Sequence, residues 1–111
     1  MRVIKIDIDT KEVYVIEDFA TELSVQDDLD LHIGTEQPVV GGMIKGHAFV
    51  VPNKKNIGQW AYAIEGVKGV FYESGIIAGA DENFQLISTS IEPKDIHVAF
   101  VANGLKIITN K

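Results

Sequence analysis

One short stretch of the chain gathers side chains that could hold a planar anion. It contains two lysines flanked by asparagines and followed by two aromatic residues: Asn53, Lys54, Lys55, Asn56, Trp60 and Tyr62. Ammonium and amide groups bind anionic oxygens through hydrogen bonds, and flat rings stack on planar ligands. These residues are therefore candidates for binding a small, nucleotide-like anion. The alternative is a lysine-tipped loop followed by two core aromatics, and the exposure of Trp60 distinguishes the two interpretations.

Acidic residues define a second candidate site because they are concentrated in the first part of the chain. Residues 1–43 carry ten acidic and three basic residues, whereas residues 44–111 carry six acidic and seven basic residues. An acidic surface repels phosphate, which argues against duplex nucleic acid, and it attracts a basic protein surface. We predict a surface for a protein partner formed by Glu22, Asp27, Asp28, Asp30 and Glu36. The alternative is a solvated face that keeps the protein in solution.

Residues that commonly carry catalysis or metal binding show no grouped spacing in this sequence. The three histidines lie far apart, at His32, His47 and His97. No serine stands in a G-x-S-x-G or S-x-x-K motif, and the absence of cysteine excludes a thiolate nucleophile or thiolate metal site. We therefore predict a binding protein rather than an enzyme, with no cofactor and no metal. An acid–base pair assembled by the fold remains a third alternative, because such a pair needs closeness in space and not in sequence.

Length and composition predict one globular domain over residues 1–111. With 46% hydrophobic and 23% charged residues, the chain has ordinary globular composition and can form one core. No apolar run approaches the roughly 20 residues that cross a bilayer. The first residues alternate charged and apolar side chains, unlike a signal peptide. Because cysteine is absent, a reducing cytoplasm is the expected compartment.

Alternation of apolar and polar residues predicts most of the elements. Residues 2–8 and 12–16 are expected to form a β-hairpin that turns over Asp9-Thr10-Lys11. Residues 43–51 are expected to form one strand ended by Pro52, and residues 76–89 a second hairpin. Residues 17–36 are expected to be an acidic connection that enters a strand near Leu29.

Two segments fit more than one element. Residues 57–65 fit a helix between Asn56 and Gly66, yet Trp60, Tyr62 and Ile64 alternate with other residues as in a strand. Residues 93–102 fit a helix, whereas the pair Asn103-Gly104 favours a hairpin between residues 97–101 and 105–109.

These elements together predict an α+β fold that is mostly β. We expect a small antiparallel curled sheet or partial barrel with one or two short helices. Strand edges that such a sheet exposes also favour a homodimer.

Two parts of the chain resemble small uncharacterised proteins of bacteriophages and mobile elements. They are the opening Met1–Asp7, and Gly75–Asn83 followed by Thr89–Ile96, which together cover 24 of the 111 residues. The resemblance implies a short helix in residues 93–102, a phage or mobile-element origin and a host protein as partner. It also implies an inhibitor or anti-defence role in the cytoplasm of the bacterial host. It carries over no active-site residue.

Overall fold

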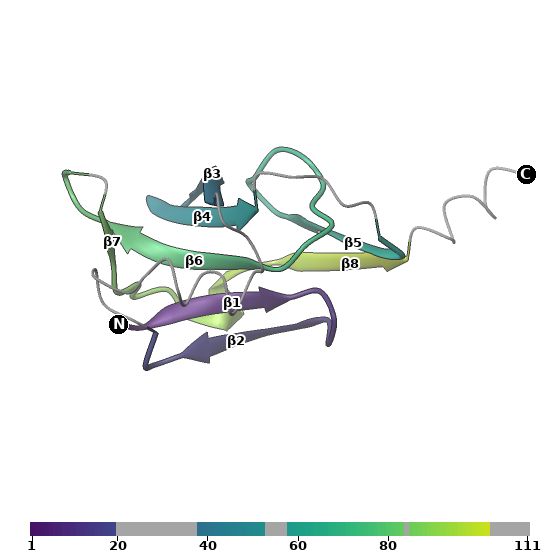
Figure 1. Cartoon of the computed structure of the whole chain (residues 1–111), viewed down its shortest axis with the longest axis horizontal. Coiled ribbons are helices and arrows are strands. Elements are labelled where there is room, and N and C mark those ends of the chain that lie inside the picture. The colour runs from purple at the N-terminus through teal and green to yellow at the C-terminus, as the bar shows by residue number, and fades with distance from the viewer. Residues whose placement is uncertain (20–37, 53–57, 84, 103–111) are drawn as a thin grey trace, which may run out of the picture.

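An antiparallel sheet that pairs the start of the chain with its later strands is the largest feature of the structure (Figure 1). The structure, a computed structural model, describes residues 1–19, 38–52, 58–83 and 85–102. The strands of this sheet are β1 (Val3–Asp7), β2 (Glu12–Ile16), β3 (Pro38–Ile44), β4 (His47–Pro52), β6 (Gly75–Ala80) and β7 (Leu86–Ile87). Their order is β2-β1-β6-β4-β3, and β7 pairs with the end of β6.

A second, two-stranded sheet lies against the first. It consists of β5 (Trp60–Ile64) and β8 (Val98–Ala102), which pair antiparallel along their whole length. One short 3-10 helix, η2 (Pro93–Asp95), precedes β8. The prediction of a mostly β, antiparallel α+β fold is confirmed, and its sheets are not closed. Within the part of the chain described here, no helix is long and apolar enough to cross a bilayer.

Apolar side chains are buried on both faces of the larger sheet. On one face, Ile4, Ile6, Phe49 and Ile77 join Tyr62 and other residues of the β5–β8 layer in one cluster. On the other face, Val3, Val50, Ile76 and Ala78 pack with Phe19. β1 and β6 therefore lie in the interior of the fold, so that residues of the first strand are part of the hydrophobic core.

The predicted first hairpin is confirmed, and Asp7 fixes its turn. The Asp7 Oδ1 atom accepts hydrogen bonds from the N–H groups of Asp9 (3.0 Å) and Thr10 (3.2 Å), and Oδ2 accepts one from the Tyr14 hydroxyl (3.1 Å). The Lys5 ammonium lies 3.7 Å from Oδ2. Burial opposes ionisation, but these donors outweigh it and lower the pKa of Asp7 below its ordinary value.

The charge of Asp7 is therefore expected to stabilise the fold in a pH-dependent way. The stabilisation is present above the unfolded-state pKa of about 3.9 and is lost as the pH falls through the lower folded-state pKa. We expect Asp7→Asn to lower the free energy of unfolding by about 1 kcal/mol at neutral pH. The difference should shrink when urea unfolding is repeated at about pH 2. A difference that stays constant with pH would contradict a role for the charge.

The expectation of one strand over residues 43–51 is wrong, because a tight turn divides the segment. Lys45 and Gly46 both have positive φ, at 49° and 82°, which is the geometry of a two-residue hairpin turn. β3 and β4 pair on either side of this turn, with Ile44 opposite His47. The Lys-Gly pair carries a weaker turn signal than Asn-Gly, although its glycine takes the second left-handed position.

The two ambiguous segments are mainly strands. Trp60–Ile64 is β5, so the helix considered for residues 57–65 is wrong over these positions. Residues 93–102 contain only the three-residue η2 before β8, and β8 pairs with β5. The strand expected at residues 105–109 lies outside the described residues, as does the strand expected near Leu29. The predicted hairpin over residues 76–89 is confirmed as β6 and β7.

Candidate functional site

The residues predicted to form the protein-docking surface are outside the described part of the chain. They are Glu22, Asp27, Asp28, Asp30 and Glu36. Glu17 and Asp18, which begin the same acidic run, follow β2 directly and are both exposed. The structure shows which charged residues from other parts of the chain lie near Glu17.

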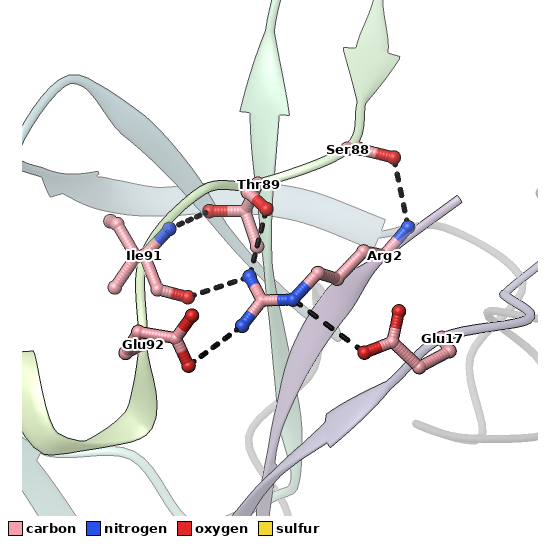
Figure 2. Close-up of polar contacts among 6 residues, drawn as sticks. All are labelled: Arg2, Glu17, Ser88, Thr89, Ile91 and Glu92. Carbon is pink, nitrogen blue, oxygen red and sulfur yellow. Dashed lines mark hydrogen bonds and ion pairs between the residues drawn. The ribbon is translucent and has the colours of Figure 1, made fainter.

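Arg2 connects the start of the chain to the segment between β7 and η2 (Figure 2). Its Nη1 atom donates hydrogen bonds to the carbonyl oxygens of Thr89 (2.9 Å) and Ile91 (2.8 Å). Its backbone N–H donates to Ser88 Oγ (2.9 Å), and its carbonyl oxygen accepts the N–H of Thr89 (2.8 Å). These contacts hold residues 88–91 beside the first strand.

The same guanidinium brings acidic residues from distant parts of the sequence together. Nη2 of Arg2 lies 3.0 Å from Glu92 Oε2, and Nε lies 3.8 Å from Glu17 Oε1. The Glu92 and Glu17 side chains remain 53% and 77% exposed. Because η2 contacts β2, the exposed Asp95 also lies on this side of the molecule. We call Glu17, Asp18, Glu92 and Asp95 the acidic edge.

None of the four acidic-edge residues was among those predicted for the partner surface, although Glu17 and Asp18 belong to the acidic connection expected over residues 17–36. Glu92 and Asp95 belong to the later part of the chain, where acidic and basic residues nearly balance. Glu92 lies beside Glu17 because both pair with Arg2, which also bonds the carbonyl oxygens of Thr89 and Ile91, and no local pattern indicates these contacts. The acidic character of this side of the molecule is thus a product of the fold as well as of the sequence.

A second feature is a small pocket at the start of β5. It encloses about 290 Å³ and is lined by Ile8, Asp9, Lys11, Gly58, Gln59, Trp60 and Tyr72, which we call the tryptophan pocket. Trp60 is half-buried, and the Lys11 Nζ atom lies 4.2 Å from the centre of its ring. That distance is within the range of a cation–π interaction. The pocket thus combines a cation with two aromatic side chains, Trp60 and Tyr72.

The residues predicted to bind a planar anion are placed in different surroundings. Trp60 lines the tryptophan pocket, whereas Asn53, Lys54, Lys55 and Asn56 lie outside the described residues. Tyr62 is fully buried in the core, and its hydroxyl donates a hydrogen bond to the Glu73 carbonyl oxygen (2.7 Å). Burial, with a smaller contribution from the Glu73 charge, raises the pKa of Tyr62 far above its ordinary value. Tyr62 is therefore a neutral core residue.

The histidines are also in separate places. His47 Nδ1 lies 3.0 Å from the hydroxyl of Thr89, and exposed His97 lies 4.0 Å from Glu65. His32 is outside the described residues. Among the residues whose placement is described, no three His, Asp or Glu side chains are grouped so that they could hold one metal ion.

Comparison of the chain with protein-family models, with curated proteins and with solved structures finds no match. The acidic edge and the tryptophan pocket are therefore the features from which a function can be inferred. They are built by different residues. The acidic edge depends on Arg2 and η2, and the pocket depends on the first hairpin and β5.

Proposed function

We propose that this chain is a non-enzymatic binding protein that docks on a basic surface of a protein partner through its acidic edge. The observation that carries the proposal is the double ion pair of Arg2, which places exposed Glu92 beside exposed Glu17. One of these exposed carboxylates comes from the acidic first part of the chain and the other from its later part, and both lie on one side of the molecule. The acidic run that starts at Glu17 and continues to Glu36 without Lys or Arg adds to the same charge.

The main effect expected of such an edge is on the rate at which the protein associates with its partner. Exposed charges attract an opposite surface over about 8 Å at physiological ionic strength. Clustered charges of one sign therefore accelerate association and make its rate depend on salt, while individual exposed ion pairs contribute little to final affinity. The edge also disfavours duplex nucleic acid, because phosphates carry the same sign of charge.

The sequence resemblance to phage and mobile-element proteins suggests the setting of this proposal. We place the partner in the cytoplasm of a bacterial host, where the protein would act as an inhibitor in an anti-defence role. The homodimer expected from the sequence stays a prediction.

Reversing charge on the acidic edge tests the proposal. Affinity capture from the host supplies the partner, and surface plasmon resonance of the purified pair measures association at low and high salt. We expect Glu17→Lys/Asp18→Lys to slow association about tenfold at low salt and to flatten its salt dependence. The difference should become small at high salt, where charges on the surface are screened.

A matched control changes the net charge equally at a different place. Glu65 and Glu82 are exposed carboxylates outside the acidic edge, in the turns after β5 and β6. Glu65→Lys/Glu82→Lys should leave the association rate much closer to that of the unmodified protein. If both double variants slow association equally, net charge alone is responsible and docking through the acidic edge is excluded.

A further inference from the structure

We propose that the tryptophan pocket binds a planar aromatic ring that carries a single anionic group, such as a nucleoside monophosphate. The proposal is independent of docking through the acidic edge, because the two features share no residue. It rests on a cation, two aromatic side chains and an amide that line one small cavity.

The cation of this pocket is held in place by an unusual backbone. Lys11 has a φ of 59°, a left-handed conformation that costs a non-glycine residue energy. Residues kept in such conformations often lie at ligand sites, where the surrounding structure holds them. The turn fixes it here: the Lys11 N–H donates to the Asp7 carbonyl oxygen (2.8 Å), and Nζ lies 3.4 Å from the Asp9 carbonyl oxygen. The ammonium is thus positioned over Trp60 before any ligand arrives.

The other lining residues suit a flat ring. Trp60 and Tyr72 are both half-buried, so part of each aromatic surface stays accessible. Stacking on aromatic side chains is worth about 1–3 kcal/mol per nucleic-acid base and tolerates any ring. Gln59 is exposed at the same pocket, and its amide provides both a donor and an acceptor for polar atoms at a ring edge.

Size and charge limit the ligand further. The cavity of about 290 Å³ is slightly smaller than typical small-molecule sites, which span about 300–1,000 Å³, and it suits one ring system with a short substituent. The Asp9 carboxylate lines the pocket beside Lys11, which is the one cation among its described lining residues. A second or third phosphate group on the ligand would face Asp9, so one anionic group is favoured over a polyphosphate.

Nuclear magnetic resonance of the full chain tests the proposal. Trp60 is the sole tryptophan, so a ¹⁵N-labelled sample has one indole N–H resonance, and it reports on this pocket. We expect adenosine monophosphate to shift it in a saturable way with a dissociation constant below about 1 mM. Adenosine and inorganic phosphate, which each lack one part of the ligand, should bind at least about tenfold more weakly.

Two further ligands test which anionic group the pocket prefers and how many such groups it accepts. 2-Naphthoate carries a carboxylate on a flat ring, so its binding relative to adenosine monophosphate distinguishes a carboxylate ligand from a phosphate ligand. Adenosine triphosphate should bind more weakly than the monophosphate, and tighter binding would contradict a single anionic group. If neither adenosine monophosphate nor 2-naphthoate shifts the indole resonance saturably, the pocket does not bind this class of ligand and the proposal is wrong.

Lys11→Gly and a matched variant locate the anion contact. Glycine adopts the left-handed conformation readily, so Lys11→Gly removes the ammonium while keeping the turn. It should weaken binding of adenosine monophosphate at least about tenfold. Lys45→Gly is the control, because Lys45 is an exposed lysine with a φ of 49° in the other tight turn, and it should leave affinity unchanged. Equal affinity of the Lys11→Gly variant would overturn the assignment of the anion to Lys11.

Discussion

Replacement of Gly75 by alanine is expected to lower the free energy of unfolding by about 3 kcal/mol. A Cβ atom at Gly75 would lie 2.5 Å from Phe49 Cε1 and 3.0 Å from the Tyr62 hydroxyl oxygen. Both side chains are fully buried. The Phe49 ring also packs edge-on against Phe71, with ring centres 4.8 Å apart, so it has little freedom to move away. Urea unfolding followed by circular dichroism measures the change.

Gly58→Ala is the matched control for this substitution. Among the described residues other than its chain neighbours, none has a heavy atom within 4 Å of a Cβ built at Gly58, and the φ of Gly58 is not in the left-handed region. Its stability should stay within about 0.5 kcal/mol of the unmodified protein. A Phe49→Leu background tests whether the clash is with the Phe49 ring. Because that ring is absent there, Gly75→Ala should lower the free energy of unfolding by less than it does in the unmodified protein. If the Gly75→Ala and Gly58→Ala proteins are equally stable, the Phe49 and Tyr62 side chains can move to make room for the new Cβ atom, and the expected clash is wrong.

Sequence patterns predicted those strands whose alternation is strong. Ile4 and Ile6 alternate with charged residues, and they lie in β1, an interior strand of the larger sheet. The pattern failed at Lys45-Gly46, because apolar residues on both sides of this pair were joined into one strand, whereas the turn between them depends on two positive φ values. It also left Trp60–Ile64 open, since alternation there competes with capping residues that fit a helix. Pairing with β8, far along the chain, decides in favour of the strand.

The candidate sites were less predictable than the strands, because they join residues that the fold brings together. Trp60 was selected for its type, but its nearest described cation is Lys11 from the first hairpin and not a lysine from its own segment. Tyr62, two residues later, points into the core. The order of strands in the two sheets determines these neighbours, and hydrophobic periodicity gives no information on that order.

Replacement of Arg2 by alanine is expected to lower the free energy of unfolding by about 3 kcal/mol. The largest contribution comes from its two hydrogen bonds to the carbonyl oxygens of Thr89 and Ile91. Both of these residues are buried, with 2% and 6% exposure, so the carbonyl groups would lose a charged donor in a poorly hydrated place. The exposed ion pairs of Arg2 with Glu17 and Glu92 add little. Urea unfolding measures the total.

Conservative variants separate these contributions. Glu17→Gln removes the 3.8 Å ion pair and leaves the carbonyl contacts, so its stability should change by less than about 0.5 kcal/mol. Arg2→Lys keeps the charge but lacks the planar fork that bonds two carbonyl oxygens and a carboxylate together, so it should fall between Arg2→Ala and the unmodified protein.

Hydrogen exchange links this stability to the acidic edge. The amide of Thr89 donates to the Arg2 carbonyl oxygen, so this amide reports directly on whether residues 88–92 stay beside the first strand. In Arg2→Ala it should exchange faster than the amides in the β1–β6 ladder, because the anchor is lost locally before the sheet opens. If its protection is unchanged, other contacts hold the segment, and Glu92 would stay beside Glu17 without the guanidinium. The acidic edge would then depend on η2 packing against β2 and not on Arg2.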